Sequence, residues 1–193
     1  MRRDDRRSAH RGVARAAVVR PAGVGDAAKI HALLVEVAAQ SPLALLTDLP
    51  GDPRALEAGL AASGGDRLLV AVAATDDDQV DGVLFAIRGP GPSAHTANLS
   101  LAVAARARRR GMASALIAGA QKWARAHGVE RLTASVAAAN GPALALFPAC
   151  GFAIEGRRPD HIRVGQALYD EILFGVATQG VRGGIGAVRV VLP

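Results

Sequence analysis

The stretch RARRRGMASALIAGAQKWA, residues 106–124, decides how this sequence is interpreted. Four arginines in five positions precede Gly111, and an alanine-rich segment with apolar residues at helical spacing follows. The pattern predicts a turn that leads into a helix, which Gly128 then stops. The first N–H groups of such a helix have no partner within it and carry the positive end of the helix dipole. The stretch therefore predicts a site for a compact anion such as a phosphate.

Two kinds of residue strengthen this prediction. Gly111 permits a φ angle or a close backbone approach that a side chain forbids, and the arginines add charge-assisted contacts to phosphate oxygens. The stretch lacks the Gly-Lys-Ser/Thr ending of a nucleoside-triphosphate P-loop and the Gly-x-Gly-x-x-Gly of a dinucleotide fold. Neither nucleotide class is therefore predicted.

Length and composition indicate one globular domain with a core of small aliphatic side chains. The chain has 193 residues, of which 50% are apolar and only 3% are aromatic. No apolar run reaches the roughly 18 to 20 residues that span a bilayer, and no apolar stretch follows the N-terminal arginines as in a signal peptide. We expect no membrane partner and a cytoplasmic location. Cys150 has no metal-ligand spacing around it, and no metal is expected.

The net charge of +6 is concentrated at the N-terminus. Residues 1–20 hold seven arginines against two aspartates, a net of +5, which leaves +1 for the rest of the chain. We interpret residues 1–13 as a basic, disordered arm, residues 14–176 as the domain, and the glycine-rich residues 177–193 as a tail that could add a strand. The arm could alternatively bind nucleic acid. The near-neutral charge of the domain does not favour that interpretation.

Hydrophobic periodicity predicts a mixed α/β or α+β sheet. Besides the helix after Gly111, helices are expected over 21–40, with Asp26 as N-cap, and over 54–63 and 141–150. Strands are expected over 16–20, 67–75, 79–88, 95–104, 132–138, 151–158 and 167–176. A charged loop between the last two strands could border a substrate site, and it contains Arg157, Arg158, Asp160, His161 and Arg163.

A second motif follows the first at a distance of about 30 residues. The run Arg108-Arg109-Arg110-Gly111-Met112-Ala113 resembles the Arg/Gln-x-x-Gly-x-Gly/Ala signature of the GNAT acetyltransferases. The later run from Asn140 through Ala143 and Leu146-Phe147 to Gly151-Phe152 is similar to the Asn-x-x-Ala-x-x-Leu-Tyr-x-x-x-Gly-Phe of that family. The resemblance extends over about residues 14–176 and is firmest from 97 to 174.

This resemblance implies a single domain with a central, splayed, mostly antiparallel mixed sheet of six to seven strands, flanked by about four helices. The implied cofactor is acetyl-CoA or another acyl-CoA, with no metal. The N–H groups of residues 109–114 would hold its pyrophosphate, and Leu101 and Val103 would pair through their main chains with the pantetheine arm and the thioester. Asn140 would contact the pantetheine or hold the strand end in place, and Phe147 would also contact the cofactor. The full set of implied binding residues is Leu101, Val103, Arg108, Arg109, Arg110, Gly111, Met112, Ala113, Ser114, Asn140 and Phe147.

The chain departs from the family pattern in its acid and base groups. Many members have a tyrosine at the position of Phe147, which could protonate the departing thiolate, and phenylalanine cannot donate a proton. Residues 95–104 contain no carboxylate that could act as the base. His95, Ser100 and Tyr169 remain as candidate catalytic residues, each of which also has an ordinary structural explanation.

Three functions are consistent with the sequence. The first is an N-acetyltransferase that acts on a primary amine of a small molecule or a protein by direct attack in a ternary complex. The second is an acyl-CoA-binding module or sensor without turnover, which Phe147 and the missing carboxylate suggest. The third is a nucleic-acid-binding protein, although neither arginine cluster contains interleaved aromatic residues. The β-prone tail is compatible with a homodimer.

Overall fold

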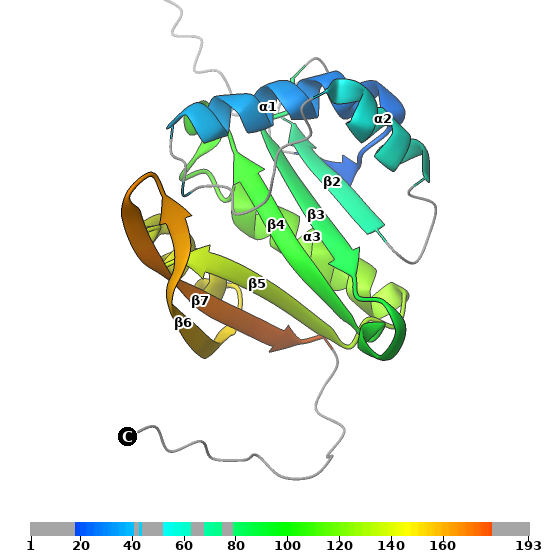
Figure 1. Cartoon of the computed structure of the whole chain (residues 1–193). Coiled ribbons are helices and arrows are strands. Elements are labelled where there is room, and N and C mark those ends of the chain that lie inside the picture. Colours follow the sequence, from blue (N-terminus) through cyan, green and yellow to red (C-terminus); the bar gives the residue numbers. More distant parts are fainter. Residues whose placement is uncertain (1–17, 41–42, 44–51, 63–67, 75–78, 179–193) are drawn as a thin grey trace, which may run out of the picture.

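The computed structural model describes residues 18–40, 43, 52–62, 68–74 and 79–178. Within these residues a twisted sheet forms the centre of the molecule, and α-helices cover both of its faces (Figure 1). The predicted arm, residues 1–13, and residues 179–193 of the predicted tail lie outside the described residues. No helix in the described part of the chain is long and apolar enough to cross a membrane.

The sheet has seven strands in the order β1-β2-β3-β4-β5-β7-β6. Neighbouring strands are antiparallel except β4 and β5, which run parallel. This arrangement confirms the predicted mixed and mostly antiparallel sheet of six to seven strands. The strands are β1 (Val18–Pro21), β2 (Leu68–Ala74), β3 (Gly82–Arg88), β4 (Thr96–Val103), β5 (Arg131–Ala137), β6 (Ala153–Val164) and β7 (Ala167–Ala177).

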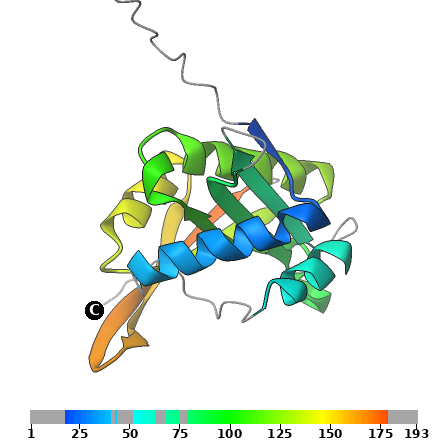
Figure 2. The same ribbon diagram turned by 90° about the horizontal axis from the view of Figure 1, so that it is seen from above.

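The helices form the two outer layers (Figures 1 and 2). On one face lie α1 (Ala27–Gln40) and α2 (Pro53–Ala62), and α3 (Met112–Ala126) crosses the opposite face. The short α4 (Gly141–Ala149) packs on the α3 side, where Phe147 stacks on Phe174 of β7. Because helices cover both faces, the central β3 is buried on both sides over most of its length, as its nearly continuous apolar sequence requires.

Two local predictions are wrong. Asp26 is not the N-cap of α1, because residues Val24–Asp26 form a 3-10 turn that continues into the helix and Gly23 takes the capping position. The Asp26 carboxylate instead accepts hydrogen bonds from the guanidinium of Arg20, at 2.7 and 2.9 Å, and from the Gly23 amide at 2.8 Å. The Asp26 carboxylate therefore binds Arg20 instead of capping α1.

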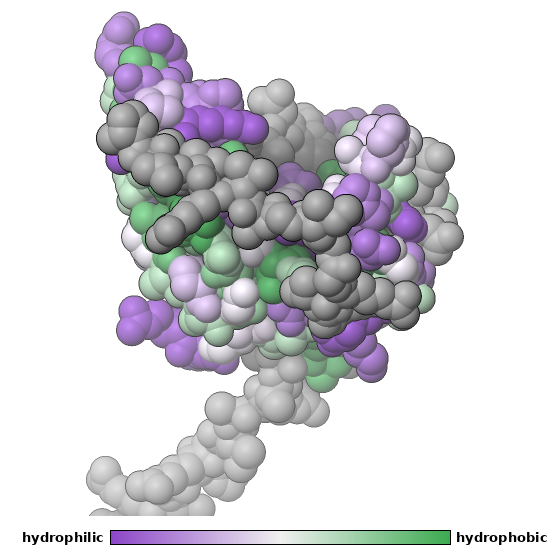
Figure 3. All heavy atoms as spheres, turned by 90° about the horizontal axis from the view of Figure 1, so that it is seen from below, coloured by the Kyte–Doolittle hydropathy of each residue, from purple (hydrophilic) through white to green (hydrophobic). Residues whose placement is uncertain are grey.

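The predicted charged loop between the last two strands is also wrong, since residues 157–163 belong to β6. The strands β6 and β7 form a long hairpin whose pairing shifts register after Ile154 and after Arg158. Arg158 lies opposite Glu171, and Arg157 lies opposite Ile172 and contacts the neighbouring Asp170, so charges on one strand meet charges on the other. The hairpin projects from the body of the molecule, and its surface is mainly hydrophilic (Figures 1 and 3).

Candidate functional site

A cleft opens where the two parallel strands of the sheet separate. The pairing of β4 with β5 runs from Thr96 opposite Arg131 to Leu99 opposite Ala134 and then stops, although both strands continue. In the described part of the chain, the β5-facing main-chain groups of residues 100–103 therefore have no partner strand. A cleft of about 770 Å³ occupies this opening. Its position leaves strand-like hydrogen-bonding groups available to an extended ligand.

The turn between β4 and α3 lines one end of this cleft. Arg109 and Gly111 have positive φ angles of 62° and 78°, whereas Arg108, with a φ of −66° and a ψ of 157°, is extended. Left-handed residues on both sides of Arg110 give a turn of the kind whose successive N–H groups can form a cradle for an anion. The first helical hydrogen bond is donated by the Ala115 amide to Gly111 O, at 2.9 Å. The preceding amides of residues 112–114 have no acceptor among the described residues.

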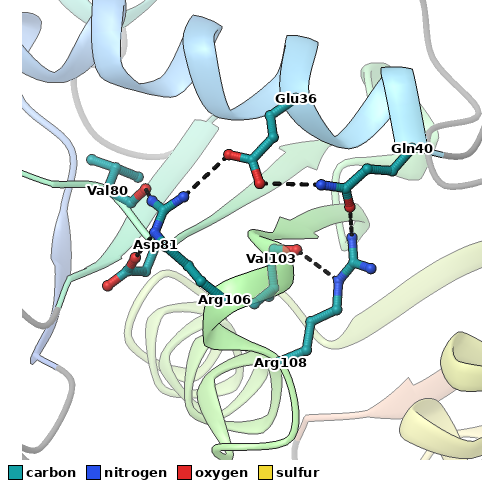
Figure 4. A network of polar contacts seen from close by, with 7 residues as sticks. All are labelled: Glu36, Gln40, Val80, Asp81, Val103, Arg106 and Arg108. Atoms are coloured by element: carbon teal, nitrogen blue, oxygen red, sulfur yellow. Dashed lines mark hydrogen bonds and ion pairs between the residues drawn. The ribbon is translucent and has the colours of Figure 1, made fainter.

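The arginines of this turn divide into two groups. Arg106 and Arg108 make hydrogen bonds within the protein, to side chains of α1 among others (Figure 4). Arg109 and Arg110 are exposed, and their side chains have no acceptor among the described residues. Arg109 lines the cleft and Arg110 does not. Among the described residues, Arg109 is thus the cation in the cleft wall that no protein acceptor engages.

The opposite wall of the cleft is the start of α4. Asn140 caps this helix: its Oδ1 accepts a hydrogen bond from the Ala143 amide at 3.3 Å, and its Nδ2 donates to Leu43 O at 3.4 Å. Phe147 lies further along the helix, and only 5% of it is exposed. Its ring stacks on Phe174 and meets Phe152 edge to face. This aromatic cluster gives Phe147 a packing role in addition to its place in the cleft wall.

The cleft gathers ten of the eleven binding residues that the resemblance implies. Arg110 is the exception. The ten that line the cleft are Leu101, Val103, Arg108, Arg109, Gly111, Met112, Ala113, Ser114, Asn140 and Phe147.

The candidate catalytic residues are not brought together. His95 precedes the first residue of β4, at the end of the strand away from the cleft, and its Nδ1 lies 3.1 Å from Pro92 O. Tyr169 lies on the projecting hairpin, opposite Ile162, and does not line the cleft. Ser100 does line it. Among the described lining residues, no carboxylate, histidine, tyrosine or cysteine is present.

Sequence reasoning missed Ser135, Val37 and Leu43, which also line the cleft. Ser135 directly follows the last paired residue of β5, as Ser100 follows the last paired residue of β4. Ala134 pairs with Phe174, whose ring packs on α4, so the next residue along β5 points to the opposite face. Ser100 and Ser135 therefore face the α1 side. The alternation within each strand could have suggested which face each serine points to. The sequence could not have shown that the two serines meet, because the pairing of β4 with β5 is a tertiary contact.

The charges of the hairpin are used within it. The Asp170 carboxylate accepts a hydrogen bond from the Asp160 amide at 2.9 Å and also contacts Arg157, and these contacts hold the pKa of Asp170 below its usual value. Arg158 donates to the nearly buried Glu171 at 2.9 Å. Most of the predicted charged segment thus stabilises the β6–β7 pairing.

Comparisons with solved structures agree with this architecture. An acetyltransferase of the GNAT family from Streptococcus pneumoniae is 25% identical, with a TM-score of 0.74 over 84% of this chain and 99% of its own. A ribosomal-protein-alanine N-acetyltransferase from Brucella melitensis is also 25% identical, with a TM-score of 0.74 over 83% and 99%. A protein from Salmonella typhimurium, solved with its cofactor acetyl-CoA, is 18% identical and shares the fold, with a TM-score of 0.77 over 89% and 99%.

Sequence comparison gives the family directly. No curated protein matches the chain. Residues 31–152 match the model of the acetyltransferase (GNAT) family, and this segment contains residues 105–111, which are called the anion-binding turn below after their predicted ligand, together with the diverging strands and the start of α4. The chain therefore belongs to the GNAT acetyltransferase family.

Proposed function

We propose that this chain is an acetyl-CoA-dependent N-acetyltransferase that acts on a primary amine of a small molecule or a protein. The observation that carries the proposal is the loss of β4–β5 pairing after Leu99, beside a turn in which Arg109 and Gly111 are left-handed and the amides of residues 112–114 have no acceptor among the described residues. An extended, apolar ligand arm with an anionic group at one end fits both features. Acetyl-CoA has this form, and a structural neighbour was solved with it.

The chain's own residues suit the parts of that ligand. The amides of residues 109–114, together with the charge of Arg109, would hold the pyrophosphate. The main chain of Leu101 and the amide of Val103, which have no partner strand on the β5 side, would pair with the pantetheine amides in the manner of an added strand, whereas Val103 O already accepts a hydrogen bond from Arg108. Asn140 would fix the start of α4 as the second wall.

When bound, acetyl-CoA supplies an activated thioester; the acceptor nitrogen bonds to the acyl carbon, the carbon–sulfur bond breaks, one proton leaves the nitrogen and one reaches sulfur. The protein contributes chiefly proximity and orientation. Phe147 cannot donate a proton, and the only hydroxyl groups among the described lining residues belong to Ser100, Ser114 and Ser135. Ser114 lies at the anion end. We therefore assign any proton transfer by the described residues to Ser100 and Ser135, directly or through water.

The test is thiol release from acetyl-CoA in the presence of an amine panel. The panel includes a peptide with an N-terminal alanine, because the Brucella neighbour is named for that acceptor, and several small primary amines. Release that depends on the amine supports the proposal. Measurable CoA binding without release for any acceptor would instead favour an acyl-CoA-binding module, and absence of CoA binding would contradict both.

A further inference from the structure

Arg106 anchors the anion-binding turn to two other parts of the protein (Figure 4). Its Nε donates to Asp81 Oδ1 at 3.0 Å, its Nη1 to Glu36 Oε2 at 3.1 Å, and its Nη2 to Val80 O at 3.3 Å. Asp81 is only 3% exposed. A guanidinium with three such contacts has a fixed orientation, and a buried carboxylate needs its cationic partner. Arg106 is thus committed to α1 and to the start of β3.

Arg108 continues the same network toward the cleft. Its Nη2 donates to Gln40 Oε1 at 2.7 Å, and its Nε donates to Val103 O at 3.1 Å. The amide of Gln40 in turn donates to Glu36 Oε1 at 3.2 Å. Two arginines of the turn are therefore connected through two polar side chains of the last turns of α1 (Figure 4).

The network lies next to the strained part of the turn. Arg109 has a φ of 62°, a conformation that residues other than glycine rarely adopt and that persists only where the surroundings enforce it. Arg108 precedes it directly, and the first turn of α3 follows it after Gly111. Fixing Arg108 on one side and the helix on the other holds the turn in this conformation before any anion binds.

We propose that Arg106 and Arg108 are positioning residues, which lock the anion-binding turn to the C-terminal end of α1. The inference rests on the proposed function, because the ligand of the turn is the pyrophosphate of CoA. Val37, in the same part of α1, lines the cleft. Binding of CoA and the position of α1 therefore depend on each other, and this coupling acts equally in both directions.

A turn that is held in place before binding loses less conformational freedom when the ligand arrives. Loosening the network should weaken CoA binding even where the substituted residue cannot reach the ligand. Gln40 gives the cleanest case, because it is exposed at the end of α1 and its partner is Arg108.

The experiment measures CoA affinity by titration calorimetry for the full chain and three variants. Arg106→Met and Gln40→Ala are each expected to weaken CoA binding by about tenfold. The matched control is Arg20→Met: the Arg20 and Arg106 side chains are both 42% exposed, and each pairs with a nearly buried aspartate, but Arg20 lies at the far end of α1. The control variant should bind CoA within about twofold of the unchanged protein, a difference far smaller than a tenfold loss.

A double-mutant cycle then tests the contact itself. In an Arg108→Ala background, Gln40→Ala should cause little further loss, because the interaction is already absent. Equal CoA affinity of Arg106→Met, Gln40→Ala and Arg20→Met would overturn the inference while leaving the proposed function intact. No CoA binding by the unchanged protein would instead contradict the proposed function. If Arg106→Met does not fold, Gln40→Ala and the cycle decide the question.

Discussion

Gly111 determines the shape of the anion-binding turn through its backbone rather than through lack of space. Its φ is 78°, and a Cβ built at this position would have no neighbour within 4 Å. The sequence left two explanations for this glycine, a special φ angle or a close backbone approach. In the protein itself the φ angle is the operative one, since a β-branched side chain is strongly disfavoured there.

Gly111→Val is therefore expected to weaken CoA binding by about tenfold or more, because the strain of the left-handed conformation would reshape the turn. Gly111→Asn should retain most of the affinity, since asparagine tolerates this conformation. Gly128→Val is the matched control: it has a similar φ of 67° but lies after α3, away from the cleft. Calorimetric titration with CoA checks all three. Equal affinity of Gly111→Val and the control would contradict the assignment of the turn to the pyrophosphate.

Ser100 and Ser135 are the residues to substitute for catalysis. Ser100→Ala and Ser135→Ala should each lower kcat about fivefold through loss of one hydrogen bond to a moving proton, with CoA affinity unchanged. Ser114→Ala, at the end of the cleft where the pyrophosphate would lie, should weaken CoA binding and leave kcat unchanged. Steady-state kinetics with the best acceptor, beside CoA titrations, separates the two cases. Unchanged kcat in the Ser100→Ala, Ser135→Ala double variant would mean that water alone carries the protons.

At the scale of elements, the start of α1 is held by a charged cluster that the sequence analysis assigned differently. The Arg20 guanidinium and the Gly23 amide hydrogen-bond the Asp26 carboxylate. Chiefly because of Arg20, and despite burial, the pKa of Asp26 lies below its usual value of 3.8. This links β1 to the helix whose other end, at Gln40, contacts the anion-binding turn.

The pKa of Asp26 predicts the acid dependence of stability. Because the folded-state pKa is lowered, Asp26 contributes stability at every pH above its unfolded-state value, and this contribution disappears as the pH falls through the folded-state value. In Arg20→Met the burial remains without its main partner, so the pKa of Asp26 should rise and stability should begin to fall at a higher pH. Thermal unfolding from pH 7 to pH 3 measures this.

Asp26→Asn is the control for this series, because it removes the titrating group. In the Asp26→Asn background, adding the Arg20→Met substitution should leave the pH dependence of stability unchanged. If the unchanged protein and Arg20→Met already have parallel pH profiles, the link between Arg20 and the Asp26 pKa is wrong.

At the scale of the whole molecule, most of the net positive charge belongs to the first twenty residues of the sequence. Seven of the arginines lie in residues 1–20, and the remainder of the chain has a net charge near zero. Within the cleft, only Arg108 and Arg109 are charged among the described residues, and Arg108 is engaged with Gln40. One small anion is therefore enough to pair with Arg109, the cation that remains available in the cleft.

Neutralising the arm should therefore leave CoA binding unchanged. The variant replaces five arginines by glutamine, namely Arg2, Arg3, Arg6, Arg7 and Arg11. Any binding of duplex DNA should fall steeply with salt and be lost in this variant, because it depends on phosphate contacts. Calorimetry with CoA and fluorescence anisotropy with labelled duplex provide the two measurements. DNA binding that survives both the substitutions and physiological salt would contradict the assignment of any DNA binding to the arm.

The sequence by itself determined the family and the main elements. Periodicity placed α3 and β5 within a residue or two, because each has a strong apolar pattern of its own. Gly111 marked the start of α3, because turn residues act on the backbone beside them, and the helix expected over 141–150 agrees with α4, whose cap Asn140 only the structure shows. The turn before α3 was predicted for the same reason, because its geometry is local, and its anion ligand stays a prediction.

Only the tertiary structure decided which residues meet across the fold. The segment over residues 157–163 has a charged sequence typical of a loop. Its contacts with Asp170 and Glu171 of β7 make it part of the strand β6. Ser135 enters the cleft because β5 separates from β4 after Ala134, which no pattern within β5 encodes. Arg108 looked like a phosphate ligand, yet it contacts Gln40, 68 residues away. Local propensities fix elements, whereas contacts between distant residues depend on how those elements pack.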